Sequence, residues 1–119
     1  MGASDIPAKL AKVTGIYRWA DGAHFDHDYY GSAHARLTTE LLAPLGLLRF
    51  ESDRTVLSGA PQSGVLIATS NAYFASVNEA HAALTRAGAA LAADLPQYTN
   101  IRPALHISEV LVHEPPWAR

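Results

Sequence analysis

The order in which two hydrophobic spacings follow one another constrains the fold of this chain more than any other feature. Apolar residues recur at every second position, as in a strand, in the four segments 12–19, 46–57, 65–74 and 101–112. They recur at every third or fourth position, as in a helix, between Asp26 and Leu42 and again between Ser76 and Pro96. The predicted order is therefore strand, helix, strand, strand, helix, strand.

Polar residues mark where each predicted helix begins. Asp26 precedes the first helical segment and can act as its N-cap, with Tyr29 three residues further on. Ser76 and Glu79 precede the second segment with the S-x-x-E spacing of a capping box. Because such caps satisfy N–H groups that the first turn of a helix leaves free, both helices are predicted to start at these positions.

This order of elements predicts an α+β fold. Right-handed crossovers give the ferredoxin-like βαββαβ layout, an antiparallel four-stranded sheet whose first and third strands are central. Both helices then cover one face, and we expect the other face to carry apolar surface, which monomers rarely expose. A second copy would cover that surface, so we expect a homodimeric α+β barrel. The domain is expected to span residues 11–113, between a flexible arm at 1–10 and a tail at 114–119.

Composition excludes several classes of function. The chain has 119 residues, enough for one domain, and 49% hydrophobic against 17% charged residues allow a buried core. The formal net charge is -2 and the basic residues are scattered, so no nucleic-acid partner is expected. No cysteine is present, which excludes disulfides and thiolate metal sites. No phosphate-binding fingerprint is present either, and we expect no cofactor.

The expected location follows from two further observations. No apolar run approaches the ~20 residues that a membrane-spanning helix needs. The first residues lack the apolar segment of a signal peptide. We therefore expect a cytoplasmic protein that does not contact a membrane.

The stretch HFDHDYYGSAH, residues 24–34, holds the candidate chemistry. His34 lies on the predicted apolar stripe of the first helix, which consists of Tyr30, His34, Leu37 and Leu41. It is therefore expected to face the sheet rather than water. Two interpretations remain open: a core histidine bonded to a backbone carbonyl, or a catalytic general acid/base in a cleft between helix and sheet.

The same stretch does not favour a metal site. His27 and His34 are two helical turns apart, about 10 Å on an ideal helix, which is too far to share one ion. His24 precedes the helix, and no HExxH motif is present. We therefore expect no metal.

Three further residues are candidates for binding a substrate. Tyr30 is predicted to point inward, and Tyr17 lies on the central first strand. Each hydroxyl can orient a substrate oxygen or simply complete a core contact. His106 faces the side of its strand opposite to Leu105 and Ile107, so it can line the same cleft, lie inside a dimer, or be a satisfied strand histidine.

Two motifs resemble the signature of the EthD family, named for a protein associated with ethyl tert-butyl ether degradation. The F-D-x-x-Y-Y-x-x-x-H pattern is carried by Phe25, Asp26, Tyr29, Tyr30 and His34. The A-D-x-P-x-[FY]-T pattern is carried by Ala93, Asp94, Pro96, Tyr98 and Thr99. The resemblance covers roughly residues 13–110 and implies a dimeric α+β barrel, with His34 functional and Tyr98 near the substrate.

The resemblance also implies an oxidative or catabolic setting. The wider superfamily includes cofactor-free monooxygenases, polyketide cyclases and muconolactone isomerase. We therefore expect a small cofactor-independent enzyme, or an accessory of an oxygenase system, that acts on an apolar or aromatic oxygenated molecule by acid/base chemistry. The alternatives are a non-catalytic carrier of a hydrophobic metabolite for a partner oxygenase, and a purely structural dimer.

Overall fold

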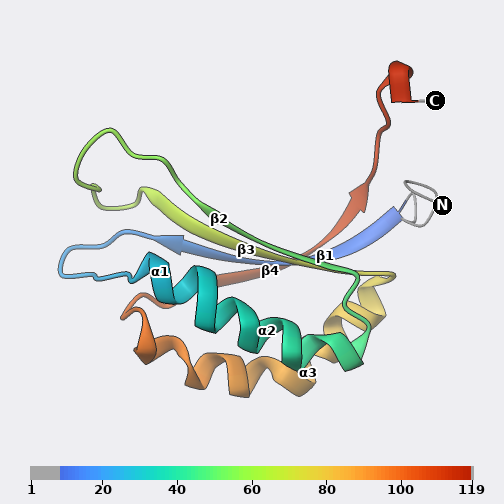
Figure 1. Cartoon of the computed structure of the whole chain (residues 1–119), viewed down its shortest axis with the longest axis horizontal. Coiled ribbons are helices and arrows are strands. Elements are labelled where there is room, and N and C mark those ends of the chain that lie inside the picture. The colour runs from blue at the N-terminus through green and yellow to red at the C-terminus, as the bar shows by residue number, and fades with distance from the viewer. Residues whose placement is uncertain (1–8, 119) are drawn as a thin grey trace.

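The computed structural model describes residues 9–118 and contains a four-stranded antiparallel sheet (Figure 1). Its strands are β1 (Lys9–Arg18), β2 (Arg49–Arg54), β3 (Leu66–Phe74) and β4 (Ala104–Leu111). They lie in the order β2-β3-β1-β4, and neighbouring strands pair antiparallel. The prediction that the first and third strands are central is confirmed.

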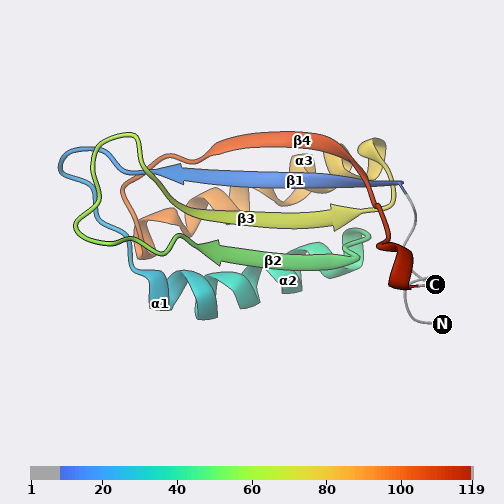
Figure 2. The ribbon, with the colours of Figure 1, turned by 90° about the horizontal axis from the view of Figure 1, so that it is seen from above.

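The helices lie on one face of this sheet (Figures 1 and 2). The first helical stretch consists of α1 (His27–Tyr29), the π-helical η2 (Tyr30–His34) and α2 (Ala35–Leu42). The second is α3 (Val77–Ala93), and short 3-10 turns form η3 (Ala43–Leu45), η4 (Leu95–Gln97) and η5 (Pro116–Ala118). This arrangement confirms the ferredoxin-like α+β fold. Within residues 9–118, every helix is too short or too polar to cross a membrane.

Local hydrogen bonds start both helical stretches at the predicted positions. The Oδ1 atom of Asp26 accepts a hydrogen bond from the backbone N–H of Tyr29 at 3.0 Å. Oγ of Ser76 accepts from the backbone N–H of Glu79 at 3.1 Å. After η3, Gly46 adopts a φ of 100°, which disfavours any residue with a side chain and turns the chain toward β2.

The first strand is longer than predicted. It begins at Lys9, and Leu10 is buried and pairs with Val110 of β4. The predicted flexible arm at 1–10 is therefore too long by two residues, because pairing with β4 holds this part of the chain in the sheet. The rest of the predicted arm, residues 1–8, lies outside the described residues.

The second strand is shorter than predicted. Its pairing with β3 ends at Arg54, which lies opposite Ala68. Val56, predicted to lie on the dry face of this strand, is 96% exposed in the loop that follows. Alternating apolar residues continue to residue 57 in the sequence, but the chain has no partner strand there.

Two different sets of side chains fill the space between helices and sheet. The end near the start of α3, here called the alanine end, packs the small buried residues Ala80, Ala83 and Ala87 against Leu42, Ala72 and Phe74. The opposite end, here called the aromatic end, brings together Tyr17, Tyr30, Tyr98, Ile67 and Ala68. Small side chains let α3 approach the sheet closely, whereas the aromatic end carries hydroxyl groups into the interior.

The uncovered face of the sheet carries both polar and apolar side chains. Thr69 Oγ1 and Asn71 Nδ2 donate to Asp53 Oδ2 at 2.8 and 3.1 Å, and Tyr73 donates to Glu51 at 3.1 Å. Alternation along β1 also places Leu10 and Ile16 on this face, where they pair with Val110 and Ala104 of β4. The predicted apolar surface is therefore present in part, and its burial by a second copy stays a prediction.

Candidate active site

A π-helical turn sets the inner face of the first helix. A π turn has bonds from residue i to i+5 and so holds more residues per turn than an α-helix. Residues spaced by four therefore stay on the same face of the helix through η2. The buried residues of this helical stretch have that spacing: Tyr30, His34, Thr38 and Leu42. The predicted stripe is correct for its first two members. Leu41 is half-buried but packs against the core, as predicted, whereas Leu37 is half-buried and belongs to neither core cluster.

The carboxylate of Asp94 holds the imidazole of His34. Nδ1 of His34 lies 2.9 Å from Oδ2 of Asp94, and their side chains are only 8% and 14% exposed. The hydroxyl of Tyr29 donates to the other carboxylate oxygen at 3.0 Å. Because a carboxylate only accepts hydrogen bonds, this pairing assigns the imidazole proton to Nδ1 and leaves Nε2 as an acceptor.

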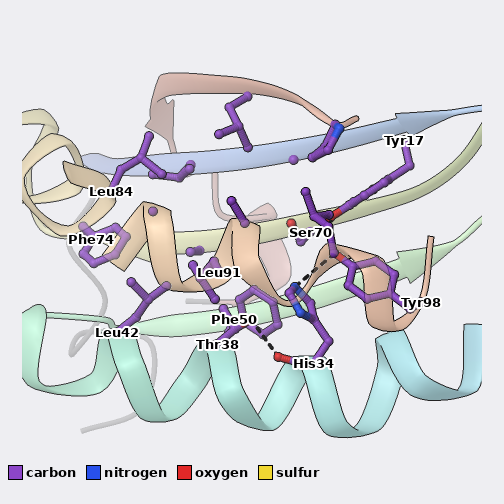
Figure 3. A pocket seen from close by; sticks show the side chains of 18 residues that line it. Tyr17, His34, Thr38, Leu42, Phe50, Ser70, Phe74, Leu84, Leu91 and Tyr98 are labelled. Atoms are coloured by element: carbon purple, nitrogen blue, oxygen red, sulfur yellow. Dashed lines mark hydrogen bonds between the residues drawn. The ribbon is translucent and has the colours of Figure 1, made fainter. Parts of the chain in front are cut away.

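The other ring nitrogen begins a chain of hydroxyl groups. Nε2 of His34 lies 3.3 Å from the hydroxyl of Tyr98, as the dashed line in Figure 3 shows. That hydroxyl lies 2.7 Å from the hydroxyl of Tyr17. The core-histidine interpretation predicted a backbone carbonyl as partner, but both ring nitrogens of His34 instead face ionisable or hydroxyl side chains. The result is a continuous path from Tyr17 through Tyr98 and His34 to Asp94.

Burial keeps the two phenols of this path protonated. Burial raises the pKa of Tyr17 above its ordinary value of 10.0, although the hydrogen bond to Tyr98 lowers it in part. Burial also raises the pKa of Tyr98, and its hydrogen bond to Tyr17 raises it further. At neutral pH both phenols are therefore hydrogen-bond donors rather than bases. The group of the path that can take a proton from a ligand is the imidazole of His34.

A cavity of about 120 Å³ opens beside His34 between helices and sheet (Figure 3). Its polar end is formed by His34, Tyr98, Tyr17 and Ser70. Its apolar end includes Leu42, Phe50, Phe74, Leu84 and Leu91. The cavity brings a proton acceptor and hydroxyl donors to one end of an apolar space, which is the common layout of a small-molecule site.

Tyr30 supports the histidine rather than lining the cavity. Its ring is nearly parallel to that of His34, with centroids 5.6 Å apart and planes inclined by 15°. Its hydroxyl is buried and makes no well-formed hydrogen bond to a described residue. Burial raises the pKa of Tyr30 far above its ordinary value, and the nearby Ser70 hydroxyl lowers it in part. Tyr30 therefore fixes the imidazole in its plane, and its predicted contact with substrate stays a prediction.

His106 lies outside this site. It is exposed and pairs with Thr14, whereas Gly15 and Leu105, the neighbouring pair, line the cavity on the other face of the sheet. The prediction that His106 shares the cleft is wrong, because alternation along β4 turns it toward the uncovered face.

The histidines at the start of the stretch also lie apart from His34. His24 is exposed and His27 half-buried, both near the loop after β2, where they line a shallow groove with Trp19. Among the residues that the structure describes, no three His, Asp or Glu side chains are grouped closely enough to hold a metal ion.

Sequence reasoning identified His34, Tyr17 and Tyr98 but missed the roles of Asp94 and Ser70. Asp94 was part of the A-D-x-P motif, and its place directly after α3 was the available signal. Its partner is 60 residues away in sequence, so no local pattern links the two. Ser70 lies within the most apolar strand and carries no sequence signal of function.

Solved structures with the same arrangement identify the kind of fold. An EthD-like protein from Ralstonia eutropha is 28% identical, with a TM-score of 0.73 over 91% of this chain and 97% of that one. The resemblance to EthD-like proteins is confirmed. An EthD family protein from Bacillus halodurans is 21% identical, with a TM-score of 0.61 over 86% of this chain and 99% of that one.

A more distant structure shares the fold alone. SnoaB, a cofactor-independent oxygenase from Streptomyces nogalater, is 13% identical, with a TM-score of 0.52 over 92% of this chain and 98% of the other. No protein-family model and no curated protein sequence matches this chain.

Proposed function

We propose that this EthD-like protein is a small enzyme that moves a proton on an apolar or aromatic oxygenated molecule. The observation that carries the proposal is the Asp94–His34–Tyr98 path at the polar end of a cavity. A histidine oriented by a carboxylate and facing a ligand space is the arrangement of a general base.

The chemistry follows from the positions of the groups. Nε2 of His34 takes a proton from an acidic C–H or O–H of the ligand, and the electron pair stays on the ligand as an enolate or phenolate. The protonated imidazole remains paired with Asp94. The hydroxyl of Tyr98 or Tyr17 donates a hydrogen bond to the new oxyanion. Return of the proton from Nε2 to a different carbon completes an isomerisation. Its return to the alkoxide formed when the enolate attacks a carbonyl of the same molecule completes a cyclisation, and its transfer to a departing hydroxyl group, which leaves as water, completes a dehydration.

This step needs no cofactor, because it transfers only a proton. Deprotonation of an aromatic or enolisable ligand also precedes direct reaction with oxygen, and SnoaB is described as a cofactor-independent oxygenase. The setting that we propose is accordingly oxidative catabolism or polyketide-type chemistry, with this protein acting alone or beside an oxygenase system.

Deuterium exchange tests the proposal without knowledge of the natural substrate. Phenylacetone, a neutral single-ring ketone with an acidic CH₂ group, is incubated with the protein in heavy water, and exchange is followed by NMR. We expect catalysed exchange that falls about 10²–10⁴-fold in His34→Asn, the usual contribution of a positioned base.

His106→Asn is the matched control, because it makes the same substitution on the exposed face of the sheet. It should keep full exchange. A folded His34→Asn protein with undiminished exchange would contradict the proposal.

A non-catalytic carrier for a partner oxygenase is the second candidate. The apolar end of the cavity favours it, because such a surface binds a hydrophobic metabolite without any chemistry. A carrier would bind phenylacetone without accelerating exchange, and His34→Asn would leave its behaviour unchanged.

The homodimer is part of the same proposal. The first support is that the outer edges of β2 and β4 have no partner strand among the described residues. The second is a group of exposed apolar side chains at and after the end of β4: Leu111, Val112 and Trp117, which are 64%, 43% and 85% exposed. A monomeric mass at micromolar concentration would contradict it. The absence of cysteine is compatible with the reducing cytoplasm, where we place the protein.

A further inference from the structure

The space beside His34, which is partly open to solvent, limits the size of what can bind wholly inside it. Its volume is about 120 Å³. An engineered apolar cavity of about 150 Å³ is known to hold one benzene molecule. The space beside His34 therefore fits a single ring, and a fused ring system would have to displace the helices or leave rings in solvent.

The lining of the cavity also limits the charge of a ligand. Among the described residues, no Lys, Arg, Asp or Glu side chain lines it. Asp94 lies behind His34 and is already bonded to His34 and Tyr29. An ionised group buried in such a space without an opposite charge is strongly disfavoured, so the ligand that fits is uncharged.

A glycine on the sheet opens one polar point of the cavity. Gly15 on β1 lies opposite Ser70 on β3, and both line the cavity. A Cβ atom at position 15 would lie 2.8 Å from the Oγ atom of Ser70 and 3.9 Å from the ring of Tyr17. The missing side chain therefore leaves the Ser70 hydroxyl open to a ligand, at the same end as Tyr17.

We propose that the cavity binds an uncharged single-ring aromatic compound with one oxygen substituent. The oxygen accepts a hydrogen bond at the polar end from Ser70, and the ring lies among Phe50, Phe74 and Leu91. The inference rests on the proposed site, but it concerns the class of ligand and not the reaction.

Binding of a defined panel to the full-length chain tests this inference. Affinities are measured by calorimetry for phenol, toluene, benzoate, 1-naphthol and 9-phenanthrol. Phenol should bind best, and toluene, which lacks the oxygen, about tenfold more weakly, the equivalent of one hydrogen bond. Benzoate, which has one ring but a negative charge, and 9-phenanthrol, which has three rings, should bind at least tenfold more weakly than phenol.

Two variants locate the oxygen. Ser70→Ala should weaken phenol binding about fivefold or more while leaving toluene binding unchanged. Ser108→Ala, the same substitution on the exposed face of β4, should change neither. Gly15→Ala should also weaken phenol binding, because the added methyl group displaces the Ser70 hydroxyl.

Several results would overturn the inference. One is that benzoate binds as tightly as phenol, and another is that 9-phenanthrol binds more tightly than phenol. A third is that none of the five compounds binds. The order of affinities is also measured in His34→Asn. If that variant keeps the order while the wild type shows no catalysed exchange, the class of ligand stands and the proposed reaction fails.

Discussion

The two ends of the space between helices and sheet use the same elements in opposite ways. At the alanine end, Ala80 and Ala83 are 0% and 1% exposed, and α3 lies close to the sheet without a polar contact between those side chains. At the aromatic end, Tyr98 is 1% exposed but its hydroxyl is bonded to Tyr17 and faces His34. Burial alone therefore does not distinguish a core from a site in this molecule.

The difference lies in what the buried groups do. The alanine end stabilises the fold through close packing of apolar atoms. The aromatic end places polar groups inside, and Tyr17, Tyr98 and His34 bond to one another at the polar end of the cavity. The apolar end of the same cavity is lined by Leu42 and Phe74 of the alanine end. Substitutions at the first end are expected to change mainly stability, and substitutions at the second to change mainly chemistry.

The largest expected effect on chemistry comes from Asp94→Asn. The amide can donate to Nδ1 of His34, which would move the imidazole proton to Nε2 and remove the acceptor that faces the cavity. Catalysed exchange should fall by about 10²–10⁴-fold, as for other carboxylates that orient a catalytic histidine. Asp21→Asn, in an exposed turn, is the control and should exchange as the wild type does. Equal rates of catalysed exchange in the two variants would show that Asp94 has no part in the proposed reaction.

At the alanine end, Phe74→Ala should have the largest effect on stability. Phe74 is 1% exposed and packs against Ala80 and Ala83. Its truncation should lower the free energy of unfolding by about 3–5 kcal/mol in urea titration, from lost burial and a new cavity. Val56→Ala, at a 96% exposed position, should cost less than about 0.5 kcal/mol. A small effect of Phe74→Ala would mean that this end is loosely packed.

Alkaline pH should destabilise the aromatic end specifically. Burial raises the pKa of Tyr98 in the folded protein above the ordinary value of 10.0, so above about pH 10 the unfolded chain loses its phenolic proton while the folded chain keeps it. The stability that depends on the protonated phenol is fully present below that pH and is lost as pH rises toward the pKa of the folded protein. Tyr98→Phe should flatten this decline in urea titrations above pH 10. An unchanged pH dependence would show that Tyr98 is not buried as described.

The smallest expected effect is that of the helix cap. Ser76→Ala removes the hydrogen bond from Glu79 N–H and should cost about 1 kcal/mol of unfolding free energy. Because the cap lies beside the alanine end, catalysed exchange should stay at the wild-type rate. A drop in exchange without a change in stability would mean that the two ends are coupled.

Local patterns predicted the alanine end well. The cap at Ser76, the small residues of α3 and the central place of β1 and β3 all follow from short-range spacing. The apolar surface predicted for the uncovered face is present only in part, because spacing gives the alternation within a strand but not which set faces the helices. Leu37 was predicted to face the core but belongs to neither core cluster, because nothing in the residues of η2 indicates a π turn.

The aromatic end was only half predictable. The motif and the helix period placed His34 and Tyr30 inside, and the second motif held both Asp94 and Tyr98. The bonds that make the path join residues 60, 64 and 81 positions apart, and only the folded chain shows which nitrogen of His34 faces which partner. His106 was predicted into the site for the same reason, since its side of the sheet could not be read from the strand alone.

The protonation of the His34 ring is the most direct test of the central claim, that Asp94 holds this histidine as a base facing the cavity. Nitrogen-15 NMR of the ring at slightly alkaline pH, with and without phenol, reports both nitrogens separately, and His34→Asn assigns the signals. We predict a protonated Nδ1, an unprotonated Nε2, and a change of the Nε2 signal when phenol binds. A protonated Nε2, or a ring that does not respond to bound phenol, would contradict the account.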